Sequence, residues 1–520
     1  MLFLSLLPIV TAEIIPRHVI FSPPGYSSLK LSPDGKYLAF IQRDKNNVGN
    51  VFFRNLPSGP TRQVTFEPKN SVLDYGFTAL PDVIYYSQDN NGDENTMLYA
   101  KNVSQKAIRT NQSARSIISD RVGVKAKILG NNYVDPRLLV GINDVNSTMY
   151  NVYSYDLLAK KLTLVMRNKR FPEVYLDNDL NVRIAYEEQR DGTAIYYRVK
   201  RLAKPGQVLS SDNSRWEKLL HLSAEDSLSN AFMGFDKANN NVYWLWSDST
   251  NDLEKVVKFP IKNAKKRTTL FQPSKGGIGS VLWNYTDKSV MAITELYHKN
   301  EWYSLNGSIQ DDIQKMVDHR STATLYILSH STDQNLFLLM YDFAEKPAEF
   351  FLYRRSRKAI VPLFDTQPQL KPYRFNSMVG FTFRARDGLL IQAYLSFPPD
   401  TPLRSPRDVP ARSREYAEIG IVPLTPQKMI INVHGGPNLR DSYGFDTVNA
   451  WLTNRGYIVL QVNFRGSNGF GRKFINAGNG EWGRKMHSDI LDALEFAVDH
   501  GIANKSQIAI LAPVTVVTKF

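Results

Sequence analysis

The residues best placed to do chemistry in this 520-residue chain are His434, Gly435, Gly436 and Pro437. They directly follow Met429–Val433 (MIINV), a continuous apolar run of the kind that is buried on both faces of a parallel sheet. Two successive glycines let the backbone turn sharply and point N–H groups into a cleft. Such groups stabilise the oxyanion of an acyl-transfer reaction, and Gly436 is the best candidate donor. The alternative is a tight turn from strand to loop without a catalytic role.

The segments around this motif alternate between strand and helix patterns after about residue 370. The predicted elements are a hairpin at Val379–Leu395 with its turn at Arg386–Gly388, a loop over 398–428, helices at Thr447–Asn454 and Met486–His500, and further buried strands at Tyr457–Val462 and Gln507–Leu511. Strands that alternate with helices indicate βαβ units. We therefore expect residues 371–520 to form an α/β domain that carries the glycine motif.

The preceding part, from about residue 26 to 365, has the pattern of short strands separated by turns. Ser32-Pro33-Asp34-Gly35 begins the series, because proline and glycine suit the central positions of a turn. Six further units follow at Phe77–Val103, Leu138–Leu164, Val182–Val199, Phe232–Lys258, Val281–Leu305 and Thr324–Leu363. A period of about 35 to 50 residues is typical of a β-propeller. We expect a seven-bladed propeller over 13–370 with an N-terminal extension and no long helix; a pair of β-sandwiches is the competing fold.

Three consecutive segments after the glycine motif carry a family resemblance. They are Asn463–Gly471 (NFRGSNGFG), Arg472–Gly483 (RKFINAGNGEWG) and the helix that begins at Met486. Together with His434–Pro437 this run resembles the prolyl oligopeptidase family of serine peptidases, particularly its acylaminoacyl-peptidase and dipeptidyl-peptidase-like branches. Ile15-Pro16-Arg17, SPDGKYLAF at 32–40 and Asp93-Glu94-Asn95 are also similar. The resemblance implies a propeller that caps an α/β-hydrolase domain, with short peptides as substrates.

The sequence lacks the nucleophile segment of that family. There, the strand after the last helix leads into G-x-S-x-G, which raises the catalytic serine above the sheet. Here Ile508–Leu511 runs into APVTVVTKF, and no G-x-S-x-G occurs among the 520 residues. In the family the triad Asp and His follow the serine, and His434 has a structural place in the oxyanion loop. His487 and His500 are expected to be surface or packing residues.

Two functions remain open from these residues. In the first, the chain is a serine peptidase of this family with a truncated hydrolase domain, without catalytic Ser, Asp and His, and without meaningful activity. In the second, it is a non-catalytic propeller protein that binds peptides or another protein. In either case, we expect the strand at Ile508–Leu511 to expose an unpaired edge.

Composition narrows the remaining classes of function. Lys and Arg exceed Asp and Glu by 64 − 50 = 14, yet the densest basic runs, Lys262–Arg267 and Arg354–Lys358, carry no nucleic-acid-binding pattern. The absence of cysteine excludes thiolate chemistry and Cys-ligated metals. Asp89–Glu94 lacks the spacing of a calcium loop, and Phe464–Gly471 lacks that of a dinucleotide fingerprint. We expect no metal, no cofactor and no nucleic-acid partner.

The N-terminus indicates export from the cytoplasm. Met1–Val10 is almost wholly apolar, and small residues around Ala12 fit a cleavage point. This predicts a signal peptide over 1–12 and a secreted or lumenal protein; the alternative is an apolar strand in a cytoplasmic protein. No later stretch is long and apolar enough to span a bilayer.

Overall fold

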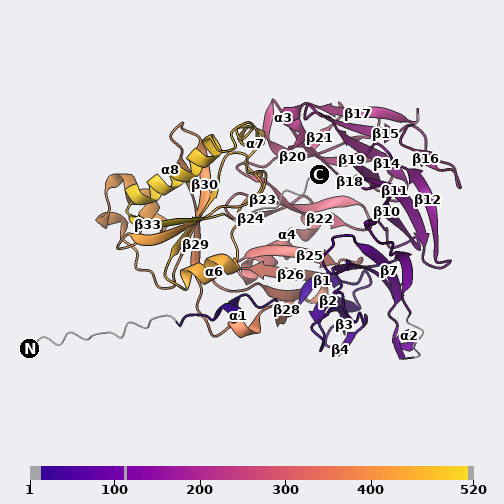
Figure 1. Cartoon of the computed structure of the whole chain (residues 1–520), viewed down its shortest axis with the longest axis horizontal. Helices are drawn as coiled ribbons and strands as arrows, with labels where there is room; N and C mark the ends of the chain where they lie inside the picture. The colour runs from indigo at the N-terminus through magenta and orange to yellow at the C-terminus, as the bar shows by residue number, and fades with distance from the viewer. Residues whose placement is uncertain (1–12, 110–113, 213, 513–520) are drawn as a thin grey trace, which may run out of the picture.

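The computed structural model describes residues 13–109, 114–212 and 214–512. It contains a ring of small sheets, coloured indigo to salmon, and an orange-to-yellow α/β region beside it (Figure 1). The predicted signal peptide at 1–12 and most of the final segment, 513–520, lie outside the described residues.

The described part of the ring contains seven sheets, which confirms the predicted seven-bladed propeller. Blades 1 and 2 comprise β1 (Ser27–Leu31), β2 (Tyr37–Arg43), β3 (Gly49–Asn55) and β4 (Thr61–Gln63), then β5 (Asp74–Phe77), β6 (Val83–Gln88), β7 (Met97–Asn102) and β8 (Ser116–Ser119). Blades 3 and 4 comprise β9 (Ala126–Gly130), β10 (Arg137–Asn146), β11 (Met149–Asp156), β12 (Lys161–Arg167) and the short β16 (Leu209–Ser210), then β13 (Glu173–Leu176), β14 (Val182–Glu188), β15 (Ala194–Val199) and β17 (Trp216–Leu222).

The remaining blades follow the same antiparallel order. Blade 5 comprises β18 (Ala231–Phe235), β19 (Asn241–Asp248), β20 (Asn251–Pro260) and β21 (Thr268–Phe271). Blade 6 comprises β22 (Gly277–Asn284), β23 (Ser289–Leu296) and β24 (Asn300–Ser304). Blade 7 comprises β25 (Thr324–His330), β26 (Leu336–Asp342), β27 (Glu349–Arg354) and β28 (Ala359–Asp365). Two short helices, α2 (Gln105–Arg109) and α3 (Ala224–Ser227), lie in connections.

Local turn chemistry sets the start of each hairpin. In blade 1, Asp34 Oδ1 accepts hydrogen bonds from Ser32 Oγ at 2.7 Å and Lys36 N at 3.1 Å, and Gly35 has φ +71°. A left-handed φ of this kind favours glycine. The predicted Ser-Pro-Asp-Gly turn is therefore present, held by its own side chains.

The ring closes by side-chain packing between blades 1 and 7. Leu38 and Phe40 of β2 share a core with Leu338 of β26, and Tyr26 stacks on Phe364 with ring centroids 4.1 Å apart. In the described residues each blade is built from strands close in sequence, and none exchanges a strand between the first and last blades. Buried apolar area, rather than a shared sheet, therefore joins the two ends of the ring.

One helix in the propeller differs from the sequence-based expectation. The ten-residue α4 (Gln310–His319) lies between β24 and β25 and buries Ile313 and Met316. Its buried Asp312 pairs with Arg355 Nε at 2.8 Å and Lys358 Nζ at 2.6 Å. The expectation of no long helix in this part was wrong, because Ile313, Met316 and Val317 follow a helical spacing that the sequence analysis did not recognise.

The α/β region contains one mixed sheet with the order β29-β30-β32-β31-β33. Its strands are β29 (Ser377–Arg384), β30 (Leu390–Phe397), β31 (Gln427–Asn432), β32 (Ile458–Asn463) and β33 (Ala503–Leu511); its helices are α5 (Arg414–Glu418), α6 (Thr447–Thr453), α7 (Arg472–Asn476) and α8 (Lys485–Asp499). β31 pairs in parallel with both β32 and β33, whereas β29 and β30 form the predicted antiparallel hairpin. The predicted strands and helices of this region are confirmed to within a few residues.

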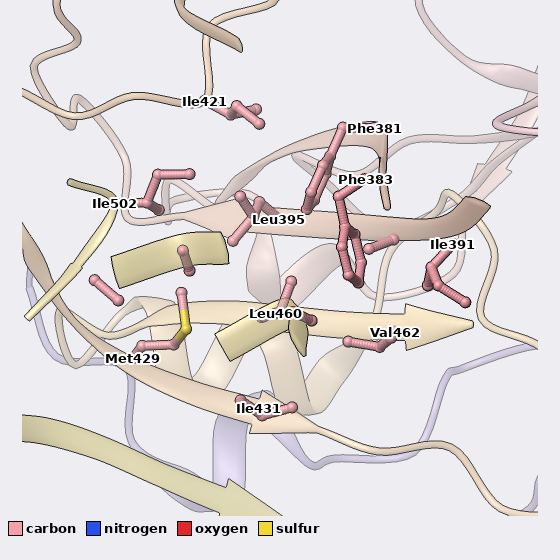
Figure 2. Packing of buried hydrophobic residues seen from close by; sticks show 14 of the residues in the cluster. Phe381, Phe383, Ile391, Leu395, Ile421, Met429, Ile431, Leu460, Val462 and Ile502 are labelled. Atoms are coloured by element: carbon pink, nitrogen blue, oxygen red, sulfur yellow. The ribbon is translucent and has the colours of Figure 1, made fainter. Parts of the chain in front are cut away.

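The core of this region lies between the sheet and its covering helices. Figure 2 shows aromatic side chains from β29 (Phe381, Phe383) and aliphatic ones from β30 to β32 packed together. Ala493 and Ala497 of α8 are fully buried against this cluster. β33 occupies the sheet edge: its Ile510 and Leu511 are exposed, and among the described residues only β31 pairs with it.

The N-terminal segment lies against the α/β region. Ile15 and the end of α1 (Arg17–Ile20) pack on Ala450 of α6, and Ile15 N donates to Asn454 Oδ1 at 2.8 Å. We expected this extension to accompany the propeller. The segment instead ties the beginning of the described chain to the α/β sheet, 439 residues away.

The α/β region covers blades 4 to 7 on one face of the propeller. Arg472 Nε of α7 pairs with Asp226 Oδ1 at 2.5 Å, Tyr394 OH donates to His298 O at 2.7 Å, and Phe445 N donates to Asp342 Oδ1 at 3.1 Å. On the propeller side, Asp226 lies in a connection between two blades. His298 and Asp342 lie where the second strand of a blade turns into the third. Because neighbouring strands are antiparallel, both kinds of connection lie on the same face.

Candidate functional site

Two loops at the carboxyl ends of β31 and β32 form the candidate site. Because these strands are parallel neighbours, their carboxyl ends meet at one sheet edge, where ligands bind in open α/β sheets. Asn438 Nδ2 donates to Gly466 O at 3.0 Å, and Asn468 N donates to Leu439 O at 3.2 Å. The two loops therefore form a single unit.

His434 fixes the beginning of the first loop. Its ring stacks on Phe464 with centroids 4.5 Å apart, Nδ1 lies 2.8 Å from Gly435 O, and Nε2 lies 3.0 Å from Ser467 Oγ. Burial lowers the pKa of His434, so the ring is neutral near pH 7. The Gly435 carbonyl requires a proton on Nδ1, so Nε2 can only accept. Nε2 and Phe464 O are then alternative acceptors for the single hydroxyl proton of Ser467.

This Ser–His contact does not form a hydrolytic pair. Ser467 is fully buried, and its Oγ also lies 2.7 Å from Phe464 O. A nucleophile must reach substrate, and a general base is usually oriented by a third group such as a carboxylate. His434 Nδ1 instead faces the Gly435 carbonyl. These contacts hold His434 at the start of the glycine loop; the structural role that the family resemblance implied for it stays a prediction.

Gly436 holds a backbone conformation that other residues rarely adopt. Its φ is +129°, and a Cβ atom there would lie 2.8 Å from Asn438 N and 2.9 Å from Leu439 N. Within the described residues, the amide N–H groups of Gly435 and Gly436 have no hydrogen-bond partner. These are the properties of a backbone donor that is available to a ligand oxygen.

Arg440 attaches this loop to the propeller. Its Nη2 donates to Tyr297 O at 2.7 Å, and its guanidinium lies 4.3 Å from the centre of the Phe470 ring. Gly277 N donates to Gly469 O at 2.9 Å, so blade 6 also holds the second loop. Across the described residues Arg440 forms no ion pair. Sequence reasoning did not identify Arg440; its position three residues after Pro437 was the available signal.

A cavity of about 220 Å³ lies between these loops and blades 5 and 6. Its lining includes Arg440, Asn468, Gly469, Leu245 and Glu254. Burial, with Asp252 nearby, raises the pKa of Glu254, and no described Lys or Arg side chain forms an ion pair with it. The cavity therefore presents an unpaired carboxylate close to the candidate oxyanion loop. Glu254 was not identified from the sequence, because nothing local distinguishes it from other strand carboxylates.

The candidate residues His434, Gly435 and Gly436 do not line this cavity, and His487 and His500 lie elsewhere. His487 is exposed on α8, whereas His500 Nδ1 lies 2.8 Å from Ser413 Oγ and its ring packs on Tyr416. The described residues contain no group of three His, Cys, Asp or Glu side chains able to hold a metal ion. No described helix is both long enough and apolar enough to cross a bilayer.

Comparison with known proteins assigns the family. The model of the prolyl oligopeptidase family matches residues 443–511. Dipeptidyl peptidase family member 6 of Caenorhabditis elegans is 46% identical over 511 residues, covering 98% of this chain and 68% of that protein. The chain belongs to the prolyl oligopeptidase family.

Other relatives agree with this assignment. Dipeptidyl aminopeptidase BIII of Pseudoxanthomonas mexicana is 29% identical over 506 residues, covering 97% of this chain and 68% of that protein. Among solved structures, a puromycin-hydrolysing peptidase of Mycobacterium tuberculosis has a TM-score of 0.65 at 13% identity, with 95% of this chain and 74% of that chain covered. The family resemblance and the propeller-plus-α/β architecture are thus confirmed. The matching relatives of this prolyl oligopeptidase family member include several dipeptidyl peptidases.

Proposed function

We propose that this chain binds short peptides by their amino-terminal end in the cavity lined by Glu254 and Arg440. We propose further that the 520-residue polypeptide does not hydrolyse them. The names of its relatives support the first part, because a dipeptidyl peptidase acts near the amino terminus of a peptide. The observation that carries it is the carboxylate of Glu254, which lines the same cavity as Arg440 and has no ion pair among the described residues.

An α-ammonium group suits this position. A cation beside a half-buried carboxylate favours the charged form of both groups, so peptide binding should lower the pKa of Glu254. Charge-assisted hydrogen bonds of this kind are short and about twice as strong as neutral ones. Glu254 and Arg440 line the same cavity, so a peptide bound through its amino end would also lie near Arg440.

The sequence supports the second part. Acyl transfer requires an activated nucleophile, and no G-x-S-x-G occurs in the 520 residues. The Ser467–His434 pair is buried and tied to backbone carbonyls. Backbone donors without a nucleophile provide binding and at most weak rate enhancement.

The experiment is a pair of binding curves with the 520-residue polypeptide. A pentapeptide with a free amino end and a fluorophore at its other end should bind at least about tenfold more tightly than its amino-acetylated form. The Glu254→Gln variant should lose this preference, whereas Glu418→Gln, an exposed acid on α5, should retain it. Equal binding of the free and acetylated peptides to the unmodified polypeptide contradicts the proposal.

Hydrolysis is measured separately. A fluorogenic dipeptide amide should show no turnover above the buffer rate, and a fluorophosphonate probe should label no serine. Turnover that such a probe abolishes would refute the second part of the proposal and leave the first part intact.

A further inference from the structure

A second cavity, of about 260 Å³, lies in blade 2 away from the Glu254 cavity. Three connections line it: Glu67–Asn70 between β4 and β5, Asn90–Asn95 between β6 and β7, and Asp120–Gly123 between β8 and β9. The first and third join neighbouring blades, and the second joins the second and third strands of blade 2. The cavity therefore opens on the propeller face that also carries the α/β region, over blades that this region leaves uncovered.

Arg115 forms the charged wall of this cavity. Its Nη1 donates to Glu67 Oε2 at 2.6 Å and to Gln88 Oε1 at 3.3 Å, and its guanidinium lies 4.1 Å from the centre of the Tyr99 ring. Glu67 is almost buried, with 8% of its side chain exposed, whereas Arg115 is 41% exposed. Glu67 and Gln88 thus bind one edge of the Arg115 guanidinium, and the Tyr99 ring covers one of its faces. The rest of the guanidinium faces the cavity.

Two of the three acids that line the cavity, Glu67 and Asp93, are already engaged, whereas Asp120 is exposed. Glu67 Oε1 accepts from Tyr86 OH at 2.6 Å, so both oxygens of this carboxylate have partners. Asp93 Oδ1 accepts from the N–H groups of Asn90 and Asn95, each at 3.1 Å, which directs it into its own loop. Lys69 adds a second cation to the lining. An incoming anion therefore meets an oriented guanidinium whose direct partner, Glu67, has both oxygens engaged.

We propose that this cavity is a peptide subsite in which Arg115 binds a carboxylate, either the carboxyl terminus or an acidic side chain. The inference rests on the proposed peptide-binding function and adds a substrate preference to it. A preformed guanidinium fork matches the two oxygens of a carboxylate, and its anchoring by Glu67 and Tyr99 reduces the entropy lost on binding.

The test uses the 520-residue polypeptide and four peptides that share one neutral sequence. The first has both ends free, the second is amidated at its carboxyl end, the third is amidated and contains one glutamate, and the fourth is acetylated at its amino end. The free-acid or the glutamate peptide should bind at least about fivefold more tightly than the amidated neutral one. Which of the two does so identifies the source of the carboxylate.

Two variants locate the effect. Arg115→Gln should abolish the preference for the carboxylate, whereas Arg137→Gln, an arginine of similar exposure (43%) paired with Asp135, should retain it. If circular dichroism shows that Arg115→Gln does not fold, Arg115→Lys replaces it. That variant keeps the charge but loses the fork, and should reduce the preference about threefold.

The outcomes separate the two proposals. Equal binding of the carboxylate peptides and the amidated neutral peptide overturns the carboxylate subsite, as does a preference that is undiminished in the folded Arg115 variant. Amino acetylation tests only the Glu254 site. Failure of every peptide to bind overturns both proposals.

Discussion

The Gln461 side chain of β32 donates a hydrogen bond to Asp441 Oδ1 at 2.9 Å, while Oδ2 of the same carboxylate is buried without a hydrogen-bond partner in the described residues. Asp441 ends the loop that begins at His434, and Asp446 is the nearest like charge to perturb it. Burial raises the pKa of Asp441 to about 7, despite opposing contributions from Gln461 and Arg440. An acid of this kind makes the loop sensitive to pH.

The pH dependence has a definite direction. The ordinary pKa of Asp is 3.8 and that of Asp441 is about 7, so between these values the native state holds a proton that the unfolded state releases. The contribution of this group to stability is therefore greatest near pH 4 and decreases as the pH rises to about 7. Asp441→Asn should raise the free energy of unfolding at pH 8 by about 1 kcal/mol and have no such benefit at pH 4. Thermal unfolding at both pH values measures this; an equal shift at both would refute it.

His434 should matter for stability. His434→Ala removes the stacking on Phe464 and the contact with Ser467 Oγ, and should lower the free energy of unfolding by about 1 to 2 kcal/mol. Urea unfolding measures the change. The exposed His487→Ala provides the control and should leave the unfolding midpoint unchanged. A neutral result for His434→Ala would show that the glycine loop is held by other contacts.

Gly436→Ala should lower the free energy of unfolding, because both the backbone conformation and steric contacts disfavour a side chain there. The φ of +129° is strained for any L-residue, and the added Cβ would approach two backbone nitrogen atoms closer than 3 Å. We expect the free energy of unfolding to fall by about 2 kcal/mol or more. Gly307→Ala is the matched control, because its Cβ meets nothing within 4 Å and its φ is not positive. Comparable stability of the two variants in a denaturant titration would argue against the described loop conformation.

The guanidinium of Arg465 should be one of the most sensitive groups in the α/β region. It pairs with Asp489 Oδ1 at 2.6 Å, and the two side chains are 5% and 0% exposed; it also reaches Asp387 at 2.8 Å. Arg465→Ala leaves Asp489 as an uncompensated buried charge, which typically costs about 3 to 5 kcal/mol. Chemical unfolding should show this loss. Arg374→Ala, which breaks the exposed pair with Asp400, should have little effect.

The strands, turns and most helices could be predicted because their signals are local. Ser32–Gly35 forms its turn through its own side chains, and Met429 and Ile431 of the predicted apolar strand are buried in the core. By contrast, α4 (Gln310–His319) was missed although Ile313, Met316 and Val317 follow a helical spacing. A helix this short depends on tertiary packing for its stability.

By itself, the sequence determined the seven blades, the alternating α/β region and the glycine motif after a buried strand, because each follows from residue spacing within one or two elements. Only the tertiary structure placed Glu254 beside Arg440, and Arg115 between Glu67 and Tyr99. Glu254 and Arg440 are brought together by the docking of the α/β region on the propeller. The second group lies within blade 2 and the connection before it, where the pairing of β7 with β8 brings the segments together. Such long-range contacts leave no periodicity in the chain, because they depend on how whole sheets pack rather than on neighbouring residues.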